Sequence, residues 1–321
     1  MFGLTFLSAT SKTTTHRKVP FTFGGTLVNA VAGYVAGGNT GSYVSGIDKI
    51  AFPADTKTTL AATLTSGREG VAGFANSGVA GYVAGGYAGY NIDGIDKVSF
   101  PADTKTTLSA VLTSGRGYVA GFANSGVAGY VAGGHAGIYI SGIDKVSFPA
   151  DSKTTLSATL TTARGYATGF ANSGTAGYVA GGHGGSFISG IDKVTFLADT
   201  KTTLSATLTT ARNYAAGFAN SGVAGYAAGG NDIGGKVSGI DKIAFPADNK
   251  STLAATLTSS REGPAGFASS GVAGYAAGGH DAAPISGIDK VTFPADTKTT
   301  LSATLTSGRN GPAGFADSGS L

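Results

Sequence analysis

The most obvious candidates for chemistry are three histidines that occupy one position of a repeated sequence. His135, His183 and His280 each follow a pair of glycines. Imidazole is a common zinc ligand, so this recurrence suggests a shared metal site. Ligand atoms lie about 2 Å from zinc, however, whereas packed sheets lie about 10 Å apart. We therefore predict that these histidines are surface side chains and that the protein uses no metal or other cofactor.

Two further charged patterns recur once in every repeat. An Asp-Lys pair begins at Asp48, Asp96, Asp144, Asp192, Asp241 and Asp289. A single arginine closes each repeat at Arg68, Arg116, Arg164, Arg212, Arg261 and Arg309. Six equivalent arginines could line an anion site near the axis of a ring. Since every repeat needs them, we instead predict that each arginine pairs with local carbonyls or with an Asp between repeats.

The remaining polar residues give little support for catalysis. The acids outside the repeated pattern are scattered among different repeats: Glu69, Asp93, Asp232, Glu262 and Asp281. Glycoside hydrolysis needs two carboxylates close together, and the chain shows no Ser/His/Asp arrangement or phosphate-binding loop. It contains no cysteine, which excludes thiolate nucleophiles and disulfides. We predict that the protein is not an enzyme.

Composition disfavours two classes of partner. Charged residues make up 12% of the 321 residues, the net charge is +4, and the basic residues are spread through the repeats. Nucleic-acid binding needs clustered Lys and Arg, so we expect no nucleic-acid partner. No window holds about 18 consecutive apolar residues, and the first 18 residues lack the pattern of a signal peptide. We expect no membrane insertion.

The elements that must position these side chains are six copies of one unit, spaced by 48 residues, or by 49 in the fifth. The units begin near Val31, Val79, Val127, Thr175, Val223 and Val272. Period-two alternation with β-branched and aromatic residues predicts strands. We expect them at residues 71–78, 32–38, 46–52 and 60–64 and their equivalents, with "PADTKTT" as a turn.

A four-stranded unit of this size cannot bury both of its faces alone, but stacked copies can. Radial closure leaves only short, protected sheet edges. The first strand of each unit is almost entirely Ala and Gly, which suits the crowded centre of a ring. We therefore predict an all-β fold, a β-propeller of six blades with four antiparallel strands each.

The repeat resembles a kelch repeat over residues 31–319. The glycine pairs that end an apolar strand are Gly37–Gly38, Gly85–Gly86, Gly133–Gly134, Gly181–Gly182, Gly229–Gly230 and Gly278–Gly279. An acidic strand, a hydrophobic strand and the closing arginine follow. Kelch units usually carry Trp in the fourth strand, and this chain has none. The motif "GYVAGG…GIDKVSFPADTKTTLSATLTSGR" is also similar to diverged kelch-like repeats in virion proteins of tailed bacteriophages, notably those infecting cyanobacteria.

The chain ends suggest how the ring closes. Residues 312–319 match the first strands of the other units, so we expect them to pair with the blade opened by Val31. In the alternative arrangement, residues 21–25 supply the missing strand. The domain prediction is therefore a propeller over residues 31–321, preceded by an attachment or assembly segment over residues 1–30.

Sequence variation is concentrated in two segments of the unit. The loops between the second and third strands read "NTGSYV", "YAGYNI", "HAGIYI", "HGGSFI", "NDIGGKV" and "HDAAPI", and the residues after the closing arginine also differ. In an antiparallel meander both segments lie at the same end of the strands, which we call the variable face. The opposite end, the uniform face, carries nearly identical "ANSG" and "PADTKTT" turns.

Loops held by a rigid scaffold often carry binding residues, and Tyr, Ser, Gly, Asn and His suit recognition. Exposed loops also vary for trivial reasons. The predicted recognition residues are Tyr43, Tyr87, Tyr90, Tyr118, His135, Tyr139, Tyr166, His183, Phe187, Tyr214, Asn231, Asp232, His280 and Asp281.

The bacteriophage resemblance implies a non-enzymatic structural protein of the virion, assembled in the host cytoplasm. Together with the one-sided variation, it suggests a tail-fibre or other exposed fibre component, an adhesin that binds a host surface glycan or protein. The alternative is a purely architectural decoration or connector protein, and a third possibility is a carbohydrate-active enzyme. Other virion proteins would bind residues 1–30 or the uniform face, within a homo- or hetero-oligomeric assembly.

Overall fold

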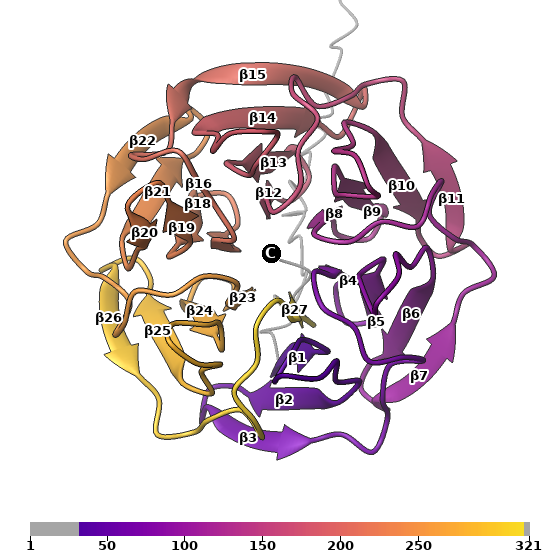
Figure 1. Cartoon of the computed structure of the whole chain (residues 1–321), viewed down its shortest axis with the longest axis horizontal. Helices are drawn as coiled ribbons and strands as arrows, with labels where there is room; N and C mark the ends of the chain where they lie inside the picture. Colours follow the sequence, from indigo (N-terminus) through magenta and orange to yellow (C-terminus); the bar gives the residue numbers. More distant parts are fainter. Residues whose placement is uncertain (1–31, 318–321) are drawn as a thin grey trace, which may run out of the picture.

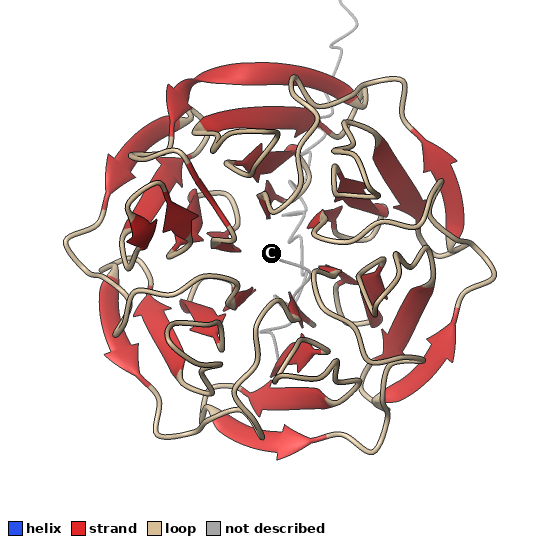
Figure 2. Cartoon of the chain, in the orientation of Figure 1, coloured by secondary structure: helices blue, strands red, loops and turns tan. Residues whose placement is uncertain are grey.

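The structure is a computed structural model that describes residues 32–317. This part of the chain folds into antiparallel β-sheets arranged around a central axis in a propeller-like manner (Figure 1). Strands and loops make up the whole of it, so no helix long and apolar enough to cross a membrane occurs among these residues (Figure 2). Six sheets have four strands each.

The strands of each four-stranded sheet run from the axis to the perimeter (Figure 1). The innermost strands are β4 (Ala72–Asn76), β8 (Ala120–Asn124), β12 (Thr168–Asn172), β17 (Ala216–Asn220), β23 (Ala265–Ser269) and β27 (Ala313–Ala316). The second strands are β5 (Ala80–Ala84), β9 (Ala128–Ala132), β13 (Ala176–Ala180), β18 (Ala224–Ala228), β24 (Ala273–Ala277) and β1 (Ala32–Ala36).

The third and fourth strands form the outer half of each sheet. The third strands are β6 (Ile95–Ser99), β10 (Ile143–Ser147), β14 (Gly190–Thr195), β21 (Ile240–Ala244), β25 (Ile288–Thr292) and β2 (Ile47–Ala51). The fourth strands are β7 (Thr104–Thr107), β11 (Ser152–Thr155), β15 (Thr200–Thr207), β22 (Asn249–Thr252), β26 (Thr297–Thr300) and β3 (Thr56–Thr59).

The fourth strand does not lie where the sequence analysis placed it. Instead of residues 60–64, strand β3 covers Thr56–Thr59, and the "TKTT" segment that we assigned to a turn is a strand. The chain reverses within four residues after β2, so pairing resumes at Thr56 opposite Ala51. Asp55 ends this tight turn with φ of +54°, a conformation that Asp tolerates better than most residues. Leu64 is instead buried between sheets.

The number of sheets also differs from the prediction, because there are seven rather than six. The seventh is a small sheet of three two-residue strands, β16 (Arg212–Asn213), β19 (Asn231–Asp232) and β20 (Gly235–Lys236). The corresponding loop of other units makes single bridges, such as the one between Tyr87 and Asn91. The extra residue in the loop "NDIGGKV" provides a two-pair hairpin that adds to the preceding link. No sheet among residues 32–317 closes on itself.

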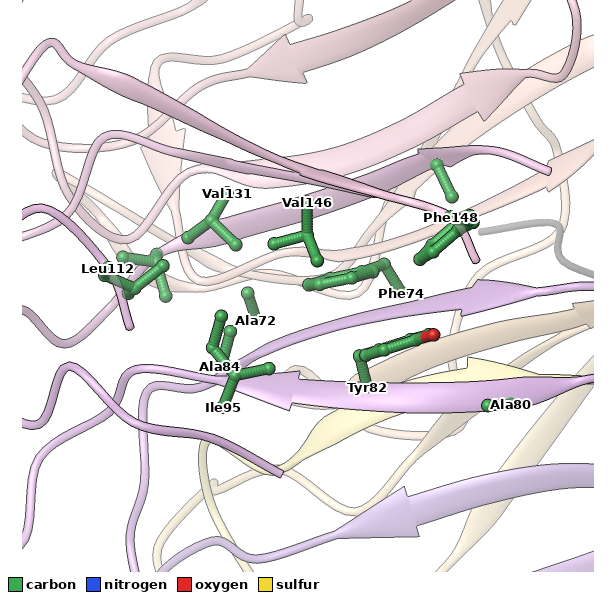
Figure 3. Packing of buried hydrophobic residues seen from close by; sticks show 12 residues of the cluster. Ala72, Phe74, Ala80, Tyr82, Ala84, Ile95, Leu112, Val131, Val146 and Phe148 are labelled. Carbon is green, nitrogen blue, oxygen red and sulfur yellow. The ribbon is translucent and has the colours of Figure 1, made fainter. Parts of the chain in front are cut away.

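The hydrophobic core consists of six clusters, each lying between two adjacent four-stranded sheets. In one of them, Phe74 stacks on Tyr82 with ring centroids 5.2 Å apart, and Phe148 of the next sheet lies 5.0 Å from Tyr82 (Figure 3). Val131 and Val146 complete this contact from the same neighbouring sheet (Figure 3). Each sheet therefore buries its apolar faces against its neighbours, as the repeat length requires.

Glycines allow the innermost strands to meet at the axis. A Cβ atom on Gly121 would lie 2.3 Å from the carbonyl oxygen of Gly73, far inside van der Waals contact. The same relation runs around all six sheets, through Gly73, Gly121, Gly169, Gly217, Gly266 and Gly314. The predicted role of the small first strands at a crowded centre is confirmed.

The two ends of the described chain join one sheet. Strand β27 pairs antiparallel with β1, with Tyr34 opposite Phe315. The prediction that the C-terminal segment supplies this strand is therefore confirmed. Residues 21–25, the alternative partner, and the proposed attachment segment over residues 1–30 lie outside the described residues.

On the uniform face, each sheet is tied to the next by the Asp of its "PAD" turn. The hydroxyl of Tyr82 and the ammonium of Lys97 both donate to Asp151, at 2.7 and 2.6 Å. The remaining acceptors of this kind are Asp55, Asp103, Asp199, Asp248 and Asp296. Six copies of one contact therefore link all six four-stranded sheets.

Candidate functional site

Both variable segments lie at the same end of the strands, as the meander predicts. Backbone bridges join the residues after the closing arginines to the variable loops: Glu69 pairs with Tyr87, and Gly117 pairs with His135. Antiparallel pairing throughout each sheet places the "ANSG" and "PADT" turns at the opposite end. The variable face is therefore a continuous surface built from loops of all six four-stranded sheets.

A ring of backbone hydrogen bonds lies at the centre of this face. Its members are Gly70, Tyr118, Tyr166, Tyr214, Gly263 and Gly311, and each donates its N–H to the carbonyl of the member before it in the ring. The six N···O distances are 2.5–2.9 Å. All six residues have φ between 56° and 63°. The last bond, from Gly70 to Gly311, joins the first and last units and completes the ring.

Three positions of this ring carry tyrosine in a backbone conformation that favours glycine. Such left-handed conformations cost a non-glycine residue about 1–3 kcal/mol, and surrounding structure must hold them in place. Here the rings of Tyr118, Tyr166 and Tyr214 hold one another, with centroids 4.3 and 4.6 Å apart for successive pairs. They converge over the axis above a cavity of about 100 Å³, which is otherwise lined mainly by Gly and Ala.

Two tyrosines of the variable loops extend this cluster outward. The ring of Tyr87 lies 6.3 Å from that of Tyr118, and Tyr43 meets Tyr87 edge-on at 5.9 Å. We call these five side chains the aromatic track. Its members are Tyr43, Tyr87, Tyr118, Tyr166 and Tyr214. All five are partly exposed, so the track offers amphipathic surface from the loop that carries Tyr43 to the centre of the face.

A second aromatic group lies in two other loops. Tyr139 meets the ring of His135 edge-on at 5.1 Å and hydrogen-bonds Nδ1 of His183 at 2.7 Å. His183 in turn contacts Phe187 at 5.3 Å. His135 and His183 are thus joined through Tyr139. Among residues 32–317, no three His, Asp or Glu side chains gather in a geometry that could hold a metal ion.

The other predicted recognition residues do not join these groups. Tyr90 is 64% exposed and projects from its loop. Asn231 and Asp232 are part of the small three-stranded sheet. Asp281 is exposed, while His280 contacts Lys236 of the neighbouring loop through Nδ1. The structure therefore brings nine of the fourteen predicted residues into two aromatic groups and leaves these five outside them.

A cavity that the sequence analysis missed lies between two loops of the variable face. We call it the loop cavity; its volume is about 380 Å³. Its lining residues are Asn39, Thr40, Gly41, Glu69, His280, Pro284 and Asn310. Glu69 and Asn310 were visible in the sequence as variable residues after the closing arginine. Their position there was the available signal, but their meeting across the first and last units depends on ring closure.

Glu69 is the carboxylate of this cavity. Burial raises the pKa of Glu69, and hydrogen bonds from Asn39 and Tyr118 partly oppose that rise. The hydroxyl of Tyr118 donates to Glu69 at 3.3 Å. Burial also raises the pKa of Tyr118, so its phenol stays protonated as a donor. Glu69 thereby connects the loop cavity to the aromatic track.

The repeated arginines and aspartates form ion pairs with one another between the sheets. Arg116 donates to Asp144 at 3.1 Å and to the carbonyl of Val131 at 3.2 Å, and both charged side chains are buried. Equivalent pairs with N···O distances of 2.8–3.1 Å occur in all six sheets. The prediction that each arginine pairs with an Asp and with carbonyls is confirmed.

Comparison with models of known protein families finds no match to this chain, and comparison with curated proteins finds none either.

Proposed function

We propose that the six four-stranded sheets are the blades of a kelch-like β-propeller, closed by the C-terminal strand. Three features support the assignment: the glycine pair after each second strand, the buried arginine between adjacent sheets, and the ring of six backbone hydrogen bonds. The small three-stranded sheet is then an elaboration of one variable loop, since it contains only two-residue strands.

We further propose that the protein is a non-enzymatic structural component of a bacteriophage virion, an exposed fibre protein that binds a host surface glycan or protein through its variable face. The sequence motif supports the phage relationship. The position of the chain ends supports exposure of the variable face, because the two ends of the described chain, Ala32 and Asp317, meet at the uniform face. There, the N–H of Asp317 donates to the carbonyl of Ala32 at 3.1 Å, so attachment through either terminus leaves the variable face free.

The observation that carries the recognition proposal is the aromatic track. Tyrosine offers rigid apolar area with a hydroxyl for hydrogen bonding, at a low cost in conformational entropy. Three of its five members occupy a strained backbone position that the other three units fill with glycine. Since glycine meets the structural need without strain, the tyrosines add backbone strain, which their mutual ring contacts oppose. A role in binding would explain why three units carry tyrosine there.

Adsorption measurements test this proposal. The full chain is applied to a glycan array and to intact bacteria. It is compared with a variant in which the loop at residues 135–140 is kept and the five remaining variable loops are replaced by its sequence, "HAGIYI". The expected result is that the parent binds and the variant does not, while both give the same β-sheet circular dichroism and thermal midpoint. Equal binding by the two proteins would exclude the variable loops as the recognition surface.

An architectural role is the second candidate, and one observation favours it. Four valines at equivalent turns of the uniform face are 44–50% exposed: Val79, Val127, Val223 and Val272. Exposed apolar groups at regular positions suit contact with other virion proteins. This role predicts that loop replacement leaves adsorption unchanged, whereas Val→Ser changes at these four positions weaken assembly.

A further inference from the structure

The loop cavity exists because two neighbouring loops carry small side chains. Three other pairs of adjacent loops on the variable face are bridged by side chains: Tyr43 reaches Tyr87, Tyr139 reaches His183, and Lys236 reaches His280. Between the "NTGS" and "DAAP" sequences, at residues 39–42 and 281–284, there are only short side chains to fill the corresponding space. The result is an opening of about 380 Å³, which falls within the range of about 300–1,000 Å³ typical of small-molecule sites.

The polar groups of the cavity are arranged to accept hydrogen bonds. Glu69 contributes a partly buried carboxylate. The two oxygens of Glu69 have room for donors besides Tyr118, which already donates to one of them. The hydroxyl of Thr40 adds a group that can donate or accept.

The charges around the cavity disfavour an anionic ligand. Glu69 lines it, and a second carboxylate, Glu262, lies 4.0 Å from His280 on the same side. Lys236 is the one nearby cation, in contact with His280 and with the backbone carbonyl of Asp281, so the two carboxylates outnumber it. A ligand rich in hydroxyl donors and without negative charge fits these surroundings.

We infer that the loop cavity binds one neutral sugar residue, whose hydroxyls donate to Glu69. This inference rests on the proposed glycan-binding function and adds the class of sugar and its place. The aromatic track is connected to the cavity through Tyr118, which donates to Glu69, and Tyr43 belongs to the loop that contains Thr40. Further residues of the same glycan would therefore lie along the track.

Saturation-transfer NMR with the full chain tests the inference. The probes are the methyl glycosides of glucose, galactose, mannose and N-acetylglucosamine, together with any glycan that the array identifies. The first variant is Pro284→Tyr, which places in this loop the residue found at the equivalent position 139. Tyr139 bridges to His183 in the loop of the next unit. A tyrosine at position 284 is therefore expected to reach across the loop cavity, fill it and weaken binding at least tenfold.

Two further variants sharpen the result. Glu69→Gln keeps the shape of the side chain but removes the charge-assisted hydrogen bond, so roughly tenfold weaker binding is expected. It also keeps the inference testable if Pro284→Tyr fails to fold. The matched control is Ile138→Ser, at a 74% exposed loop position where another unit carries Ser186; its binding is expected to equal that of the parent.

The outcomes separate this inference from the proposed function. Parent-like glycan binding by both Pro284→Tyr and Glu69→Gln would overturn the loop cavity as the site, while loss of binding on loop replacement would still uphold the variable face. Binding restricted to sulfated or acidic glycans would overturn the neutral-sugar assignment alone. Absence of all glycan and cell binding by the parent would overturn both.

Discussion

The two faces of the molecule use their polar groups in opposite ways. On the uniform face, each turn directs its side chains to the neighbouring sheet: Asp151 accepts from Tyr82 and Lys97, and the hydroxyl of Ser125 accepts from the N–H of Ser77. On the variable face, the backbone holds the ring together through N–H···O=C bonds. The turns of the uniform face are nearly identical because their side chains make contacts that every unit needs. The other face leaves its side chains free to differ.

Acidification should break the inter-sheet contacts together and has the largest expected effect. Burial raises the pKa of Asp96, but hydrogen bonds from Thr65 and Thr107 and the charge of Arg68 outweigh it, so the pKa lies below its usual value. Six equivalent Asp residues share this shift. Their contribution is complete above the unfolded-state pKa of about 3.9 and is lost as pH falls through the folded-state pKa.

The measurement is thermal unfolding followed by circular dichroism between pH 7 and pH 2. The thermal midpoint should stay level down to about pH 4, because the unfolded-state pKa of Asp lies near that pH. Below it, the midpoint should fall steeply. A midpoint that is independent of pH down to pH 2 would contradict the role of these carboxylates.

Removing one arginine should be the most damaging single change. Arg116→Ala removes the buried charge partner of Asp144 and leaves only the partly exposed Lys153, at 3.9 Å; breaking a buried pair in this way costs about 3–5 kcal/mol of unfolding free energy. Urea denaturation measures the loss, with Ile138→Ser on the variable face as the control. A change below about 1 kcal/mol, typical of exposed pairs, would show that this contact does not hold the sheets together.

A single substitution on the uniform face should have an intermediate effect. Asp151→Asn removes the ion pair with Lys97 but keeps an acceptor for Tyr82. Because the pair is partly exposed, the expected loss is about 1 kcal/mol. A double-mutant cycle with Lys97→Met isolates the pair. A coupling energy near zero would mean that the uniform turns owe their identity to something other than this contact.

Tyr166→Gly should have the smallest effect on stability while reducing binding. It introduces the residue that Gly70, Gly263 and Gly311 already provide at equivalent positions, which relieves the left-handed backbone but removes two ring contacts. The two effects oppose each other, so the change in unfolding free energy should stay within about 1 kcal/mol. Adsorption is expected to fall. A large stability loss with unchanged adsorption would assign this tyrosine to the fold rather than to recognition.

Individual strands show how far sequence patterns could be followed. The second and third strands lie where the sequence patterns placed them: the second is buried along its whole length, and the third carries Asp48 and Lys49 between buried isoleucines. The fourth strand was assigned four residues too late, because Leu60, Ala62 and Leu64 alternate as a strand would. The "TKTT" segment was assigned to a turn because it is polar and closely follows Pro53. In the folded protein, its threonines face Asp48 and solvent, which satisfies them on an outer edge.

The sequence by itself determined the repeated four-stranded unit, the small inner strands and the segregation of variation to one face. These follow from local patterns and from the alternation of turns in an antiparallel meander. Tertiary structure alone decided which tyrosines converge over the axis, which Asp each arginine meets, and that Glu69 and Asn310 share a cavity. These contacts join residues from different units, some as far apart in the sequence as Glu69 and Asn310. They depend on how closely adjacent sheets pack.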